Sequence, residues 1–328
     1  MSTSLFAPRA NFSPNPDYIG RFAPSPTGPL HFGSLISALA SYLDARAHHG
    51  RWLLRIEDID PLREQPDATA AILNSLRRHG LIWDGDVLYQ SQRLAIYHAA
   101  AIALVAEQRA FYCTCSRTQL AAQRLCQCRE QYTPPTTAAA IRLRVAPATL
   151  CFDDAVQGNY CESVDQVAGD FVIFRKQENR KPEYRKQKHR REQLPAYQLA
   201  VVVDDAAQGV THVVRGCDLL DNTARQMLLQ QNLHLPTPQY AHIPVIANAQ
   251  GQKLSKQTFA RALNDDDALG NLSAALDFLG QPSAPVSTRQ QVRDLLDFAT
   301  AAWSLSNVPR VAQLSGAALP SSCQPFAA

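Results

Sequence analysis

Apolar residues in the first hundred positions change spacing repeatedly, from short continuous runs to helical repeats and back. A run over 18–23 predicts a strand, and leucines that recur every fourth residue predict a helix over 34–48. The same alternation continues with a strand over 52–57 and helices over 67–80 and 92–108, the last with Ser91 as its expected cap. Strands that alternate with helices favour a parallel sheet, so the chain begins as a Rossmann-like α/β unit.

This rhythm is interrupted over 111–194, where cysteines, a basic segment and two isolated strands at 140–145 and 170–175 replace it. Apolar runs resume over 195–262. We therefore expect an inserted subdomain between a first Rossmann half over 18–110 and a second half over 195–262.

The two ends of the sequence have a different character. Residues 1–17 contain three prolines and no periodicity, which predicts a disordered leader, whereas 263–328 predicts a helical C-terminal region with a frayed end. Within the second half, one amphipathic helix is expected from about Asn222.

Composition is that of an ordinary globular protein. The 328 residues are 46% hydrophobic, but no apolar run reaches the length of a membrane span or of a signal peptide, so we expect a cytoplasmic protein without membrane contact. The net charge of +3 hides a basic segment, 175–191, with nine Lys or Arg against two Glu. Such a segment faces RNA or is simply a solvated loop, and both interpretations stay open.

Two short segments far apart in the chain suit an ATP polyphosphate site. In 21–34, a turn with prolines and a glycine delivers His31 to the start of a helix, where backbone N–H groups and the helix dipole favour a phosphate. In 253–257, two lysines flank a serine, a spacing typical of a loop that closes over anionic oxygens. Either segment alone is a weak signal, but together they favour nucleotide chemistry.

With these segments, the sequence resembles the class I aminoacyl-tRNA synthetases, and among them the glutamyl branch. The resemblance runs from about Tyr18 to about Leu279 and includes matching blocks at 54–60, 197–205 and 213–219. It implies an α/β fold, a Rossmann-like class I synthetase catalytic domain with an inserted zinc-bearing subdomain and a short helical C-terminal region.

The resemblance also implies how ATP binds. His31 would lie at the α-phosphate, Gly33 would let adenosine approach the backbone, and Lys256 would contact the phosphates in the transition state, with Mg²⁺ accompanying ATP. Ser34 replaces a second signature histidine, so the hydroxyl of Thr27 or Ser34 is the candidate second donor. The implied ATP-binding residues are Pro24, His31, Gly33, Ser34, Lys253 and Lys256, and the implied catalytic residues are His31, Lys256 and Thr27. The alternative is a turn histidine and a surface lysine.

L-Glutamate needs a cation for its side-chain carboxylate and an anion for its ammonium group. The resemblance assigns the carboxylate to Arg21 and Arg215 and the ammonium to Glu57; the alternative is that these charges are structural ion pairs. The implied glutamate-binding residues are Arg21, Phe22, Ala23, Pro24, Ser25, Glu57, Tyr197 and Arg215. Three further carboxylates are candidates to order the pocket or to bind magnesium: Asp204, Asp205 and Asp218. The sequence does not single out any one of them as a metal ligand.

Four cysteines within 16 residues suit tetrahedral zinc: Cys113, Cys115, Cys126 and Cys128. The family's site has a tyrosine where this chain has Arg124, which leaves Cys126 as the replacement ligand and Tyr132 as a second candidate. The alternative is a set of reduced thiols around an empty site. The other four cysteines show no partner spacing and are expected to be ordinary thiols: Cys151, Cys161, Cys217 and Cys323.

The expected partner is RNA. Only about 70 residues follow the lysine segment, so the chain resembles the short members of the branch that lack an anticodon-binding domain. These members attach glutamate to the queuosine base of tRNA(Asp), and we expect this chain to do so as a monomer. The alternatives are aminoacylation of a tRNA 3′ end, a small-molecule nucleotidylyltransferase, and a zinc-dependent RNA-binding module without catalysis.

Overall fold

The computed structural model describes residues 18–121, 126–176, 193–247, 261–285 and 291–315. Several expected features lie outside these ranges: the leader, Arg124, most of the basic segment, the two lysines of the lysine segment, Cys323 and the frayed end. In the part of the chain that is described, no helix is long and apolar enough to cross a membrane.

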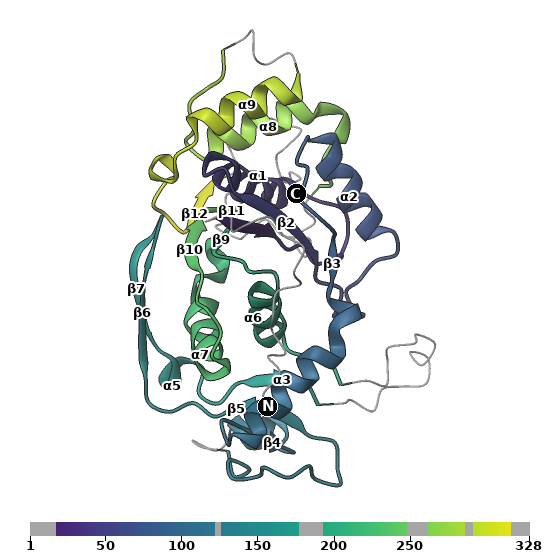
Figure 1. Ribbon diagram of the computed structural model, residues 1–328, viewed down its shortest axis with the longest axis vertical. Coiled ribbons are helices and arrows are strands. Elements are labelled where there is room, and N and C mark those ends of the chain that lie inside the picture. Colours follow the sequence, from purple (N-terminus) through teal and green to yellow (C-terminus); the bar gives the residue numbers. More distant parts are fainter. Residues whose placement is uncertain (1–17, 122–125, 177–192, 248–260, 286–290, 316–328) are drawn as a thin grey trace.

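Within the described residues, a parallel sheet forms the centre of the molecule (Figure 1). Its strands are β3 (Leu88–Tyr89), β2 (Arg51–Ile56), β1 (Ile19–Phe22), β9 (His212–Gly216) and β10 (Gln239–Ile243). The strands pair as two parallel sets, β3–β2–β1 and β9–β10. The backbone N–H of Thr211 donates to the carbonyl of Ile19 at 2.9 Å, which places β9 beside β1 and aligns the two sets in the order β3–β2–β1–β9–β10. The carboxyl ends of β1, β2 and β9 therefore meet at one edge, where α/β sheets bind ligands.

Helices cover this sheet and supply most of the core. They are α1 (Phe32–Ala47), α2 (Ala68–Arg78), α3 (Leu94–Ala106), α6 (Tyr197–Ala207), α7 (Thr223–Leu233), α8 (Ala268–Phe278) and α9 (Val292–Ala302). The leucine repeat of α1 is fully buried, and α8 and α9 pack on that helix. The predicted helices at 34–48, 67–80 and 92–108 and the one from about Asn222 are confirmed.

Two local expectations were incomplete or wrong. The apolar run that starts at Tyr197 is helix α6, for which no element was predicted. Ser91 does not cap α3; it lies in a 3-10 turn, and both its N–H and its hydroxyl donate to Asp58. Further 3-10 turns among the described residues cover Cys217–Asn222, Asp265–Asp267 and Leu305–Asn307.

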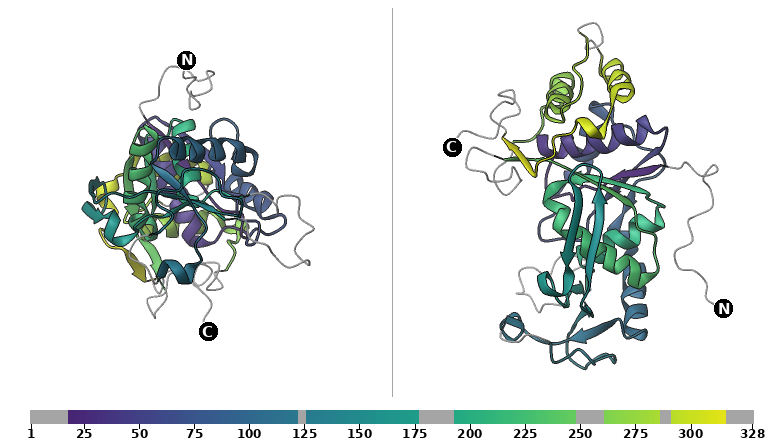
Figure 2. Two further views of the ribbon diagram at one scale, coloured as in Figure 1. Left: turned by 90° about the horizontal axis from the view of Figure 1, so that it is seen from below. Right: turned by 90° about the vertical axis from the view of Figure 1, so that its left-hand side faces the viewer.

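The segment expected as an insertion contains an antiparallel sheet and a long hairpin. The sheet is formed by β4 (Ala110–Cys113), β5 (Ala140–Leu143) and β8 (Val172–Phe174), and the hairpin by β6 (Thr149–Asp154) and β7 (Gly158–Ser163), with short helices α4 (Arg117–Ala121) and α5 (Val164–Val167). The sheet lies at the end of the molecule opposite α8 and α9, and the hairpin extends from it back along the body (Figures 1 and 2). There the backbone N–H of Ala155 donates to the carbonyl of Tyr240 in β10.

The hairpin contains a disulfide between Cys151 and Cys161, so the expectation of ordinary thiols was wrong at these two positions. The two residues face each other in register on β6 and β7, with Cα atoms 4.1 Å apart. Cys217 remains a free thiol, as expected.

Strand β11 (Val245–Ala247) pairs in parallel with β12 (Gln313–Ser315). The C-terminal region thus contributes a strand beside β11 as well as the two helices on α1.

Candidate active site and metal centre

A cavity of about 850 Å³ opens at the carboxyl edge of the sheet. All the described residues to which the sequence assigned a role in binding ATP or glutamate line it: Arg21, Phe22, Ala23, Pro24, Ser25, Thr27, His31, Gly33, Ser34, Glu57, Tyr197 and Arg215. Residues from β1, the start of α1, the end of β2, α6 and β9 thus meet in one space large enough for two small substrates.

The turn between β1 and α1 sets the position of His31. Gly28 has φ +140°, a conformation that side chains rarely adopt. His31 caps α1, and its Nδ1 accepts a hydrogen bond from the N–H of Ser34 at 3.2 Å. Because Nδ1 accepts, the ring proton belongs on Nε2, so that nitrogen is a donor suited to a phosphate oxygen. A Cβ on Gly33 would lie 3.2 Å from the His31 ring, and the glycine leaves that ring its space.

The lysine segment itself lies outside the described residues, but its C-terminal flank contacts the same turn. Ala262 and His31 form an antiparallel bridge, and the N–H of Leu263 donates to the carbonyl of Leu30 at 2.9 Å. The described residue six positions after Lys256 thus lies against the turn that carries His31.

Arg21 is a buried cation with few partners. Its side chain is 5% exposed, its Nε has no hydrogen-bond partner in the described part of the chain, and its Nη1 lies 3.5 Å from the carbonyl of Val214. The nearest carboxylate is that of Asp205, 3.5 Å from Nε. Burial lowers the pKa of Arg21 from its ordinary value. A buried guanidinium with donors to spare is suited to a ligand carboxylate.

Arg55 is a buried residue behind the cavity wall that sequence reasoning missed, although it lies in one of the matching blocks. It is fully buried and donates to Asp205 at 2.6 Å and to Glu57 at 3.3 Å. It therefore holds Glu57 at the cavity wall. Burial raises the pKa of Glu57 above its ordinary value, and the Arg55 guanidinium opposes that rise. Its pairing with a residue 150 positions away left no local signal.

Arg215 is bound quite differently from Arg21. Its Nε lies 3.0 Å from His242 Nε2, its Nη1 donates to Gln226 at 2.8 Å, and its Nη2 donates to Thr223 at 2.8 Å. All three acceptors are neutral, so the protein fixes this guanidinium without cancelling its charge. Most of its donors are occupied, which makes Arg21 the better candidate for a two-pronged grip on a carboxylate.

The three acidic candidates differ in their burial and in their partners. Asp204 is fully buried and accepts hydrogen bonds from Gln90, Arg93 and Tyr97. Asp205 is paired with arginines, as described above. Asp218 lines the cavity, so among the three it alone is placed to face ATP-bound magnesium.

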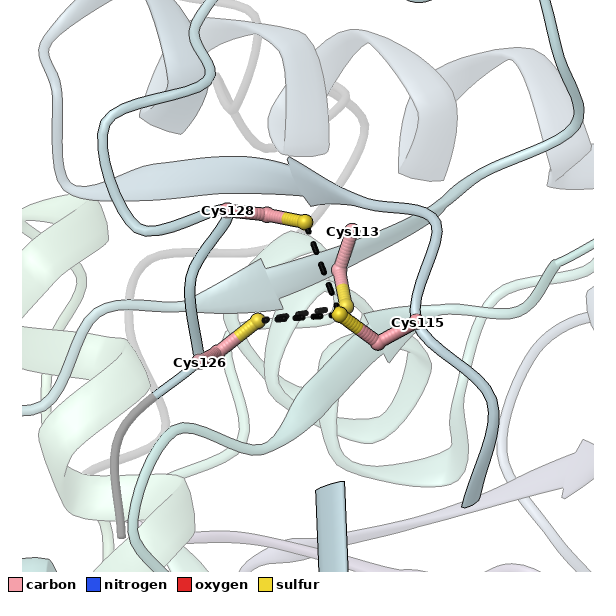
Figure 3. A group of neighbouring side chains, drawn as sticks. All are labelled: Cys113, Cys115, Cys126 and Cys128. Atoms are coloured by element: carbon pink, nitrogen blue, oxygen red, sulfur yellow. Dashed lines mark hydrogen bonds between the residues drawn. The ribbon is translucent and has the colours of Figure 1, made fainter. Parts of the chain in front are cut away.

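The four cysteines of the inserted sheet converge on one point (Figure 3). Their sulfur atoms all lie within 4.8 Å of one another, and the closest separations are 3.5, 3.6 and 3.8 Å. Four thiolates around zinc at about 2.3 Å would be about 3.8 Å apart. Burial raises the pKa of Cys113 to about 12 and that of Cys115 to about 11 in the protein alone, so a cation would have to displace those protons.

Tyr132, the second candidate for the fourth ligand, has a different role. Its hydroxyl donates to Glu130 at 2.9 Å and accepts from Arg144 at 2.6 Å. Cys126 completes the sulfur cluster instead.

Comparison with known proteins identifies the family to which the sequence is similar. The family described as "tRNA synthetases class I (E and Q), catalytic domain" matches residues 19–279. The protein named "Glutamyl-Q tRNA(Asp) synthetase" of Thiobacillus denitrificans is 46% identical over 300 residues, which cover 89% of this chain and 95% of that protein. The protein of the same name from Neisseria meningitidis serogroup B is 45% identical over 305 residues, 89% and 98% of the two chains.

Among solved structures, a glutamate tRNA ligase from Elizabethkingia meningosepticum superimposes with a TM-score of 0.70 at 22% identity. The match covers 90% of this chain and 66% of that one. Likeness at this identity shows the fold alone, which is that of a class I synthetase catalytic domain.

Proposed function

The chain belongs to the class I tRNA synthetases of the glutamyl and glutaminyl type, and we propose that it activates L-glutamate with ATP and transfers the glutamyl group to the queuosine base of tRNA(Asp). The observation that carries the choice of acceptor is the 46% identity to a glutamyl-Q tRNA(Asp) synthetase along 89% of this chain and 95% of that relative. The reaction places the protein in the cytoplasm, where tRNA and ATP are.

The charges around the cavity suit glutamate. In the buried cluster beside the cavity, Arg21, Arg55 and Arg215 carry one positive charge more than Glu57 and Asp205 together. L-Glutamate carries one net negative charge at neutral pH, which suits this cluster. Arg21 contacts the side-chain carboxylate and Glu57 the α-ammonium.

Activation joins this site to the phosphate site at the start of α1. An oxygen of the glutamate α-carboxylate attacks the α-phosphorus of ATP, and the bond to the bridging oxygen breaks as pyrophosphate leaves. Mg²⁺ bound to ATP would offset the negative charge of the departing pyrophosphate. His31, the hydroxyl of Thr27 or Ser34, and Lys256 stabilise the negative charge that develops on the phosphoryl oxygens. A hydroxyl of the queuosine base then attacks the carbonyl carbon of glutamyl-adenylate, and AMP leaves.

The cysteine cluster fits a structural zinc ion. Cys113, Cys115, Cys126 and Cys128 would hold it, and the ion would tie the end of β4 to the segment that follows α4. Because four thiolates leave no open coordination position, the metal stabilises the inserted sheet and takes no part in the reaction.

The first experiment is ATP–pyrophosphate exchange with each amino acid in the absence of RNA. We expect exchange with glutamate and rejection of aspartate, whose shorter side chain leaves the buried arginines unpaired. Lys256→Ala should lower the exchange rate far more than glutamate affinity, because its contact is made mainly in the transition state. Equal exchange with aspartate contradicts this assignment.

The acceptor is tested by transfer of radiolabelled glutamate to tRNA from cells with and without queuosine, followed by nuclease mapping. Label in the anticodon loop of tRNA(Asp), and only when queuosine is present, is the expected result. Label on a 3′-terminal adenosine would instead identify an ordinary glutamyl-tRNA synthetase.

A further inference from the structure

Behind the cavity, Arg215 is connected to the inserted hairpin through a row of buried groups. Arg215 Nε lies 3.0 Å from His242 Nε2, and His242 Nδ1 lies 2.5 Å from Asp154 Oδ2. The side chains of His242 and Asp154 are completely inaccessible to solvent. Neither residue lines the cavity and neither was singled out from the sequence.

The donors and acceptors in this row fix the proton positions. Arg215 Nε carries a hydrogen and can only donate, so His242 Nε2 must be the acceptor. The imidazole is then neutral with its single proton on Nδ1, and it donates that proton to Asp154. Burial lowers the pKa of His242 from its ordinary value, in agreement with a neutral ring.

Asp154 is itself held in one orientation. Its Oδ1 accepts three backbone hydrogen bonds, from Val156 at 3.0 Å, Gln157 at 2.8 Å and His242 at 3.0 Å. Its Oδ2 is thereby directed at the imidazole. Gln157 also donates from its side chain to the carbonyl of His242 at 2.8 Å, so the end of the hairpin is anchored to β10.

We propose that Asp154 and His242 are positioning residues for glutamate: Asp154 selects the Nδ1–H tautomer of His242, and His242 then holds the Arg215 guanidinium at the cavity through a neutral acceptor. A carboxylate in direct contact would hold Arg215 equally well but would cancel its charge. The imidazole keeps the carboxylate one ring away, so the cation stays attractive to the substrate. This inference rests on the proposed function in glutamate activation.

Asp154→Asn is the decisive variant because the surrounding backbone fixes the orientation of the new side-chain amide. The three backbone N–H groups require the amide oxygen at the Oδ1 position, so the NH₂ group faces His242 Nδ1. That nitrogen must then accept, and the ring proton moves to Nε2, where it faces the Nε hydrogen of Arg215. The contact between the two side chains is then lost, and Thr223 Oγ1, 3.2 Å from Nε2, is the acceptor that remains for the imidazole. We expect the KM for glutamate to rise about tenfold or more, as for loss of a hydrogen bond to a charged group, while the KM for ATP stays within about twofold.

Two further variants distinguish a positioning role of Asp154 from a general disturbance of the structure. Asp153→Asn makes the same change one residue away, on a side chain that contacts Asn159 and not the row, and should leave both KM values unchanged. His242→Gln retains an amide oxygen near the Nε2 position but has no tautomer to select. In that background, Asp154→Asn should change the KM for glutamate by less than about twofold. A similar increase in both backgrounds would overturn the proposal.

Nitrogen-15 NMR of the wild-type imidazoles tests the row without relying on activity, with His242 assigned from the spectrum of His242→Gln. A protonated Nδ1 and an unprotonated Nε2 at pH 7 are expected. A proton on Nε2 would refute the tautomer assignment, whether or not Asp154→Asn folds. Failure of the wild type to exchange pyrophosphate with glutamate, by contrast, would refute the proposed function and leave the NMR result to stand by itself.

Discussion

Asp205→Asn should destabilise the protein strongly, because it removes the carboxylate that neutralises two buried guanidinium groups. Asp205 is 6% exposed, and its Oδ1 lies 2.6 Å from Arg55 Nη1 and 3.5 Å from Arg21 Nε. Breaking a buried ion pair by removing one partner costs about 3–5 kcal/mol. With an unfolding entropy of about 2.1 cal/mol/K per residue over the 328 residues of the chain, this corresponds to a decrease in Tm of about 4–7 °C.

The pH dependence gives a second, independent test. Burial acts to raise the pKa of Asp205, but the guanidinium groups of Arg55 and Arg21 outweigh it and hold the pKa below its usual range. A carboxyl whose pKa is lowered on folding contributes stability that is fully present above its unfolded pKa of about 3.9 and is lost as the pH falls through the folded-state value. The Tm difference between wild type and Asp205→Asn should therefore narrow below about pH 4.

Thermal unfolding followed by circular dichroism at pH 7 and at several acidic values measures both effects. Asp266→Asn is the matched control, since its carboxylate is 85% exposed and pairs with Arg78 at the surface. We expect a shift of less than about 1 °C for this control. The reasoning fails if Asp205→Asn melts like Asp266→Asn at pH 7, or if its deficit grows as the pH is lowered.

Metal analysis of the purified protein should find about one zinc ion per chain. Cys126→Ser should lose the zinc ion, whereas the control Cys217→Ser should keep it. A wild-type protein that is fully active without metal would contradict the zinc proposal. In peptide mapping after alkylation, Cys151 and Cys161 should stay unmodified until a reductant is added, and labelling without reductant would disprove the bond. Gly50→Ala would place a Cβ 2.4 Å from a backbone oxygen and should cost about 1–3 kcal/mol or more of stability by denaturant unfolding, so an unchanged midpoint would show that the backbone yields there.

What could be predicted from the sequence was mostly local. The leucine spacing of α1 and the turn that leads to His31 are complete within about 30 residues, so both the helix and the place of His31 at its start were predictable. Helix α6 was missed because the run Leu199–Val203 is buried on every side, and a continuous apolar run fits a strand or a helix equally well.

The features that sequence reasoning missed depend on pairings between distant or opposing residues. The burial of Arg55 depends on Asp205, which is 150 positions away, and the link from Arg215 to Asp154 joins β9, β10 and the inserted hairpin. The disulfide did leave a signal: Cys151 and Cys161 are symmetric about the tight turn between Asp154 and Gly158. The expectation of reduced thiols led us to overlook it.

The central place of β1 has a consequence for how the protein is made. On the side of β9, the backbone of Ile19 is hydrogen-bonded to Thr211, which lies 192 residues later in the sequence. At a translation rate of about 5–20 residues per second, Thr211 is synthesised some 10–40 s after β1. During that interval one edge of β1 is unpaired, and Arg55 cannot be buried cheaply because Asp205 does not yet exist. The first half of the chain therefore cannot complete its core alone, and closure of the core during folding coincides with assembly of the substrate pocket.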